Sequence, residues 1–140
     1  MSRRARAYLI ALARESNDID DQLRTLDNFR DRLKGFTSNL SHDNAQSVHK
    51  PHNDRIGAYT AYVVDLERLL EERIERYSLK RSKVTEIFLQ MTDRNGSLLH
   101  LRYIDCEPWS SVADALGISV TWAYTLHNRA LKEFENLFYN

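Results

Sequence analysis

The sequence has few of the residues that crosslink chains or interrupt helices. It holds one cysteine, Cys106, which excludes an internal disulfide and fits a reducing compartment. Only four glycines and two prolines occur among 140 residues, which favours long helices. No apolar run approaches the ~18 residues that span a bilayer, and the Arg-rich start lacks the apolar core of a signal peptide. We therefore expect a cytoplasmic protein without a membrane segment.

Net charge is also absent, because 20 Lys and Arg balance 20 Asp and Glu. The balance varies along the chain: residues 1–34 carry a net charge of +2, and residues 96–140 carry −2. Because Lys and Arg supply most of the non-specific affinity for nucleic acid, an acidic C-terminal part counts against simple DNA binding. Two basic clusters remain as candidate anchors, namely Arg3, Arg4, Arg6 and Arg14 at the start and Arg76, Lys80, Arg81 and Lys83 in the middle.

Two long apolar stripes predict a helical hairpin. Between Leu9 and Leu33, and again between Ile56 and Met91, apolar residues recur at spacings of three and four. Gly35 is placed to end the first helix, the polar segment 35–53 reads as a loop, and Asn53 or Asp54 is a plausible N-cap for the second. We expect an all-α fold in which two coiled-coil-like helices run antiparallel over residues 1–92.

Apolar residues beside the second stripe suggest a further contact. Leu69, Ile74 and Phe88 lie off the main seam and widen the apolar face of the second helix. They indicate either a homodimer or a surface that covers the C-terminal part of the same chain.

Residues 93–140 read as a second domain of shorter helices. Ser97 can cap a helix that runs to about Asp105, and Pro108 opens the next helix, which ends at Leu116. The segment 117–119 is a tight corner in which a glycine permits positive φ and Ser119 caps a last helix. This helix is expected to run to about residue 138 and to bury Ala123, Leu126, Ala130, Leu131, Phe134 and Leu137. Two helices joined by a short, glycine-containing turn form a helix-turn-helix motif.

The C-terminal part resembles a known family of small phage and prophage proteins. The resemblance rests on Leu101-Arg-Tyr-Ile-Asp, Trp109-Ser-Ser-Val-Ala, Leu116-Gly-Ile-Ser and Leu126-His-Asn-Arg-Ala-Leu131. These motifs are similar to the sigma-70 region 4 helix-turn-helix and to phage transcription regulators of the RinA and ArpU type. A weaker likeness extends upstream to about two-thirds of the chain. The resemblance implies a regulator of phage genes that contacts promoter DNA, host RNA polymerase, or both, in the host cytoplasm.

By that resemblance, the start of the last helix would face DNA. The implied DNA-binding residues are Val120, Thr121, Trp122, Tyr124, Thr125, Asn128 and Arg129. Helical spacing puts most of them opposite the inward stripe of the same helix. The central basic cluster, Arg76, Lys80, Arg81 and Lys83, supplies the candidate phosphate contacts. Valine and threonine can touch thymine methyl groups, but they lack the bidentate donors that read guanine.

Catalytic and metal chemistry find no support in the sequence. His42, His49 and His52 lie in the loop beside Asp43, without paired cysteines or the helical spacing of a metal site. No glycine-rich phosphate loop or nucleophile elbow occurs. We expect no enzyme activity, no metal and no cofactor. Two functions stay open: a DNA-binding transcription regulator, or a phage-encoded module that binds a host protein without reading DNA.

Overall fold

A computed structural model describes the backbone of residues 2–42, 50–92 and 94–140, and the side chains of residues 2–36, 55–92 and 94–140. This part of the chain is helical and contains no strand, which confirms the predicted all-α class. The elements are α1 (Arg3–His42), α2 (Lys50–Gln90), α3 (Asn95–Leu99), the π-helical turn η1 (His100–Ile104), α4 (Trp109–Leu116) and α5 (Val120–Tyr139).

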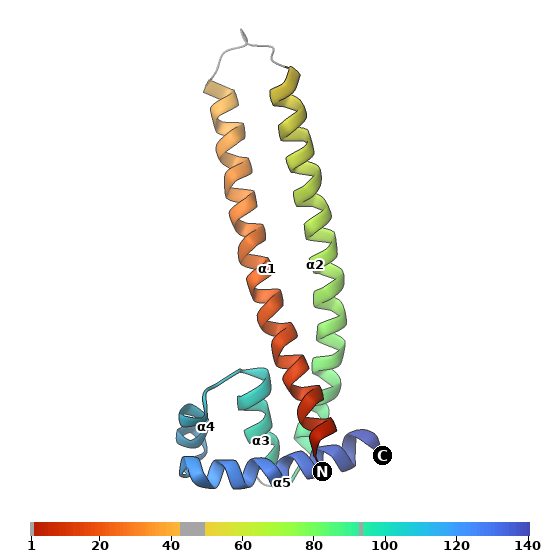
Figure 1. Ribbon diagram of the computed structural model, residues 1–140, viewed down its shortest axis with the longest axis vertical. Helices are drawn as coiled ribbons and strands as arrows, with labels where there is room; N and C mark the ends of the chain where they lie inside the picture. The colour runs from red at the N-terminus through yellow and green to blue at the C-terminus, as the bar shows by residue number, and fades with distance from the viewer. Residues whose placement is uncertain (1, 43–49, 93) are drawn as a thin grey trace. The chain divides into compact units, whose positions relative to one another are not determined.

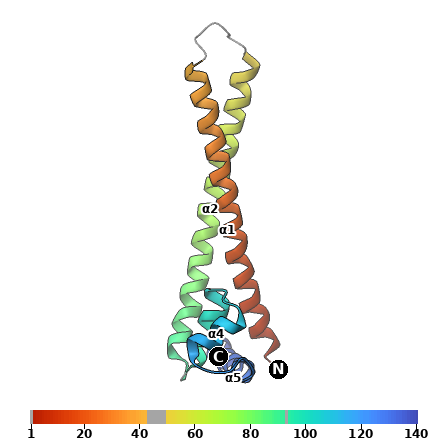
Figure 2. The same cartoon turned by 90° about the vertical axis from the view of Figure 1, so that its left-hand side faces the viewer.

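Helices α1 and α2 pack against each other as the predicted antiparallel hairpin, and they lie side by side in two perpendicular views (Figures 1 and 2). Arg73 Nη2 lies 3.6 Å from Asp18 Oδ2, and Arg30 Nη2 lies 3.0 Å from Glu67 Oε1. Residue numbers therefore rise along α1 as they fall along α2. These pairs are partly exposed and add little stability, but they record the register of the two helices.

The chain forms two compact units, and each contains part of both long helices. Unit 1 consists of Met1–Asn17 and Arg76–Asn140, whereas unit 2 is Asp18–Glu75. The expected boundary at residues 92 and 93 lies inside unit 1. Within that unit, rings of α5 contact Tyr8 in the first turns of α1 and Phe88 in the last turns of α2. Helix α4 packs against α5 and lies farther from the two long helices (Figure 1).

Unit 2 is a helix pair with a narrow apolar core. Leu26, Val63 and Leu70 are buried at its centre, flanked by the partly buried Phe29 and Leu66. These positions belong to the two predicted stripes. Leu23 also belongs to the first stripe, yet it is 36% exposed. A single pair of helices buries only the narrow seam between them.

Unit 1 is built around Phe134 of α5, which is fully buried. Its ring lies 5.6 Å from that of Phe88 on α2 and 5.1 Å from that of Phe138. Gly96 allows α3 to approach α2 closely, because a Cβ there would overlap the carbonyl oxygen of Phe88. Phe88 is thus a core residue of unit 1 and contributes nothing to a surface for a second copy, although Leu69 in unit 2 stays 57% exposed.

The first helix does not end at Gly35, and the second begins before Asn53. Helix α1 continues to His42 and α2 starts at Lys50, so the expected loop at 35–53 is shorter than predicted. A glycine inside a helix costs about 1 kcal/mol relative to alanine. Packing against α2 offsets this cost, since the ring of Phe36, one residue on, lies 6.0 Å from that of Tyr59.

Two details of the C-terminal part also differ from expectation. Helix α3 begins at Asn95, so Ser97 lies inside it and is not its cap. The reason is a distant acceptor: the Glu133 carboxylate accepts hydrogen bonds from the Thr92 N–H and the Asn95 side-chain amide, each 2.6 Å long. Leu137, expected in the core, is 41% exposed. Near the end of α5, Phe134 and Phe138 supply the inward face instead.

Candidate nucleic-acid interface

The corner between α4 and α5 forms as the local sequence predicts. Gly117 adopts φ +66° and ψ +36°, a left-handed conformation that glycine tolerates at no steric cost. The Ile118 N–H then donates to the Ala113 carbonyl at 3.0 Å and closes the end of α4. Ser119 caps α5, because its Oγ accepts a 3.1 Å hydrogen bond from the Trp122 N–H. The direction of α5 is thus fixed at its first residue.

Helix α5 divides into a buried face and an exposed face. The buried face consists of Ala123, Leu126, His127, Ala130, Leu131 and Phe134. All seven residues implied as DNA-binding are exposed on the same helix: Val120, Thr121, Trp122, Tyr124, Thr125, Asn128 and Arg129. The large side chains Trp122 and Tyr124 are 43% and 49% exposed. The candidate residues therefore do not hold the core together, and they are accessible to a partner.

Contacts within unit 1 restrain the large side chains on this exposed face. The Tyr124 ring packs against that of Trp109 on α4, with ring centroids 4.9 Å apart. The Arg129 guanidinium lies 5.3 Å from the centre of the Trp122 ring, in a cation–π arrangement. Restrained side chains lose less conformational entropy when they bind a ligand. The exposed face is thus partly preorganised.

A buried polar pair, Tyr103 and His127, adjoins Trp109, on which Tyr124 packs. The Tyr103 hydroxyl and His127 Nε2 are 2.7 Å apart, and the Trp109 ring meets the His127 ring edge-on at 4.8 Å. Burial, and then the charges of Arg6 and Arg102, lower the pKa of His127 to about 4. The imidazole is therefore neutral at pH 7. Burial also raises the pKa of Tyr103, against the opposing effect of the two arginines, so its phenol keeps its proton.

One residue of the central basic cluster, Lys83, lies away from the exposed first turns of α5. Arg76, Lys80, Arg81 and Lys83 are all exposed on α2. Of these, Lys80 pairs with Glu15, and Lys83 lies over the ring of Phe138 at 5.2 Å. Phe138 is fourteen residues beyond Tyr124, which is about 20 Å along the helix. At least Lys83 therefore sits at the far end of α5 from the candidate base-reading residues.

The N-terminal arginines lie closer to that face. Arg6 acts electrostatically on Tyr103 and His127, and the His127 ring contacts Trp109, on which Tyr124 packs. Arg3 and Arg6 also line a hollow together with Asn128 and Lys132 of α5. Asn128 is one of the residues implied as DNA-binding, whereas Arg3 and Arg6 were expected only as possible anchors and Lys132 was not singled out. The Arg-rich start of the sequence indicated a cationic site, but the local sequence does not show which helix these arginines contact in the fold.

Folding also changes the sign of the charge around the helix-turn-helix. Unit 1 contains twelve Lys and Arg against eight Asp and Glu, a net charge of +4, whereas unit 2 carries −4. The segment 96–140, taken alone, carries −2. The difference arises because the start of α1 and the end of α2 fold together with the C-terminal helices. The folded unit that carries the helix-turn-helix is therefore cationic as a whole, which favours approach to nucleic acid.

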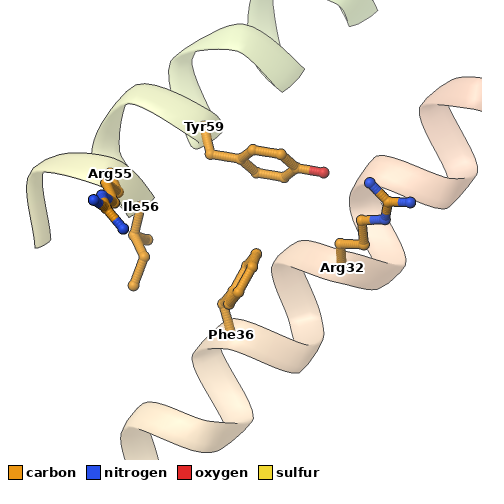
Figure 3. A pocket seen from close by; sticks show the side chains of 5 residues that line it. All are labelled: Arg32, Phe36, Arg55, Ile56 and Tyr59. Carbon is orange, nitrogen blue, oxygen red and sulfur yellow. The ribbon is translucent and has the colours of Figure 1, made fainter. Parts of the chain in front are cut away.

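Unit 2 has a hollow of its own between its two helices. It measures about 270 Å³ and is lined by Arg32, Phe36, Arg55, Ile56 and Tyr59 (Figure 3). The Tyr59 side chain points across the gap toward α1, and two arginines frame an otherwise apolar surface. None of the residues implied as DNA-binding or phosphate-binding lies here. The hollow is thus separate from the exposed face of α5.

Neither a metal site nor a comparison with known proteins adds information on the function. Among the described side chains, no group of three His, Cys, Asp or Glu residues could hold a metal ion, and the expected polar loop with His49 and His52 lies outside them. In the described part of the chain, no helix combines the length and apolar character needed to cross a bilayer. Comparison with family models, curated proteins and solved structures finds no match to this chain.

Proposed function

We propose that this protein is a DNA-binding transcription regulator of the phage type, with a helix-turn-helix similar to sigma-70 region 4, and not an enzyme. One observation carries the proposal: the first turns of α5 present Thr121, Tyr124 and Thr125 outward, while the opposite face forms the core. A recognition helix needs such an exposed face at its N-terminal end to reach base edges in the major groove. The net charge of +4 on unit 1 favours approach to DNA.

The chemistry of the exposed face favours contacts with thymine. Threonine and valine offer methyl groups that pack against the thymine methyl, and the hydroxyls of Thr121 and Tyr124 can exchange hydrogen bonds with base edges. The Thr125 hydroxyl donates to the Thr121 carbonyl at 3.4 Å, which leaves its methyl group and oxygen lone pairs available. We therefore expect modest sequence discrimination that favours A·T-containing sites.

The proposal is tested by selecting bound duplexes from a random-sequence library and measuring affinity for the selected site. A variant that combines Tyr124→Phe and Thr125→Ala keeps the ring against Trp109. It should lose about 1–3 kcal/mol of specific binding for each base that it no longer reads, and it should keep its non-specific binding. Thr60→Ala is the matched control, because the Thr60 hydroxyl makes the same hydrogen bond to the carbonyl four residues earlier, in unit 2. Equal specific affinity of variant and parent would contradict the proposed base-reading role.

A protein partner remains the second candidate function, supported by a separate apolar surface on unit 1. Leu89 is 88% exposed beside a hollow of about 540 Å³ whose lining includes Leu101 and Leu116. Exposed apolar surface of this kind often marks a protein contact. Purified bacterial RNA polymerase is the partner to test first. This function would be favoured over DNA reading by two results together. The parent protein would bind the polymerase but no DNA duplex at low salt, and Leu89→Ser would abolish the binding to the polymerase.

A further inference from the structure

The first turn of α1 and the middle of α5 form a cationic hollow within unit 1. It measures about 360 Å³ and is lined by Ser2, Arg3, Arg6, Asn128, Leu131 and Lys132. In Figure 1 the N-terminal end of α1 lies against α5. More than 120 residues of sequence separate the two sides of this hollow, so only the folding of α1 into unit 1 brings them together.

The lining has the composition of an anion site. Three of the six described lining residues are cationic, one is an amide, one a hydroxyl, and none is a carboxylate. Like charges repel when they converge, so a bound anion would relieve this repulsion. The start of α1 adds to the positive potential, because the first N–H groups of a helix have no hydrogen-bond partner within it. Here the Arg6 N–H donates to the Ser2 carbonyl, and the N–H groups before Arg6 precede this first helical hydrogen bond.

The hollow is also close to the candidate base-reading residues. Asn128 lies one helical turn beyond Tyr124 and Thr125, which is about 5–6 Å along α5. An anion held there would sit at the edge of the exposed face, where a recognition helix meets the backbone that flanks the groove. Fixed phosphate contacts at that edge would set how far the helix enters the groove.

We propose that this hollow binds a backbone phosphate of duplex DNA and orients α5 in the major groove. The inference rests on the proposed DNA-binding function and adds a site to it. Arg3, Arg6 and Lys132 supply the charge, and Asn128 donates a hydrogen bond to a phosphate oxygen. The phosphate contacts are thereby assigned to the N-terminal turn and α5, and not to the basic cluster on α2.

The test measures binding of the full-length protein to a mixed-sequence duplex between 50 and 200 mM salt. A variant with Arg3→Gln and Lys132→Gln removes two exposed charges from the hollow. The slope of log affinity against log salt should become shallower by about 0.9, the value for the one phosphate that the hollow no longer neutralises. The matched control carries Arg76→Gln and Arg81→Gln, which remove the same charge from exposed positions on α2, and should keep the slope of the parent.

A second variant guards against a purely structural effect. Asn128→Asp changes one exposed side chain by a single group and puts a carboxylate into the hollow, so it should weaken duplex binding with little change in thermal stability. If the α2 control lowers the slope while the two hollow variants bind like the parent, the inference is wrong and DNA binding stands. If the parent binds no duplex at 50 mM salt, the proposed function fails and the assignment of the hollow to DNA fails with it.

Discussion

Acidification from pH 7 to pH 5 should destabilise unit 1 through a single side chain, His127. The ring is only 7% exposed and lies between Tyr103 and Trp109. Its pKa is lowered from the usual 6.5 to about 4, because burial disfavours the cation and the nearby guanidinium groups of Arg6 and Arg102 repel it. Protonation of this ring therefore opposes folding.

The direction and size of the effect follow from the two pKa values of His127. The unfolded chain takes up a proton near pH 6.5 and the folded chain only near pH 4. Between these values the unfolded state binds more protons, so stability decreases as the pH is lowered. Each pKa unit corresponds to about 1.4 kcal/mol, so the full difference is about 3 kcal/mol. About 2 kcal/mol of it is lost between pH 7 and pH 5. The contribution is fully present above pH 6.5.

The comparison stops at pH 5 to exclude a second titrating group. Burial alone would raise the pKa of Glu133, but hydrogen bonds from Asn95 and Thr92 lower it below its usual value of 4.5. The stability that Glu133 contributes is present above pH 4.5 and is lost as the pH falls through its lowered pKa. A loss between pH 7 and pH 5 therefore does not come from Glu133.

Urea unfolding at pH 7, 6 and 5 tests this reasoning. The parent should lose about 2 kcal/mol of unfolding free energy, whereas His127→Gln, whose amide can still meet the Tyr103 hydroxyl, should vary much less with pH. His100→Gln is the matched control, since it removes a more exposed histidine from the same unit. An equal loss in the parent and in His127→Gln would show that another group causes the pH dependence.

Other substitutions test local features of the fold by thermal or urea unfolding. Ser119→Ala removes the cap that accepts the Trp122 N–H and should cost about 1 kcal/mol; an unchanged melting temperature would show that the cap is dispensable. Gly35→Ala and Gly96→Ala form a contrasting pair. The first adds a methyl group in open space on a helix and should stabilise the protein by up to about 1 kcal/mol. The second meets the Phe88 carbonyl oxygen and should destabilise it severely, so similar effects of both would contradict the described packing.

The parts of the fold that sequence predicts are those with local causes. The two stripes of apolar residues follow helical spacing, and Leu9, Leu26, Val63 and Leu70 are buried where the stripes place them. The α4–α5 corner depends on a glycine that accepts positive φ and a serine that caps the next helix, and both act within a few residues. Such features need no knowledge of distant partners.

The parts that sequence misses depend on distant partners. The predicted inward face of α5 does not include His127, whose polar ring is buried against the Tyr103 hydroxyl, 24 residues away. The start of α3 depends on Glu133, which is 38 residues beyond Asn95. Helix α1 continues beyond Gly35 because α2 packs beside it there. A glycine predicts the end of a helix only from the local sequence, which does not show this packing.

Arg6 connects the buried pair to the proposed phosphate site. Its charge helps to lower the pKa of His127, and its side chain also lines the cationic hollow. A phosphate bound in that hollow would neutralise part of this charge and so raise the pKa of His127 from its value of about 4. By linkage, protonation of His127 would strengthen phosphate binding by the same factor. The two effects can be compared by following the His127 ring resonances through a pH titration with and without duplex. A pKa that the duplex leaves unchanged would place the phosphate away from Arg6.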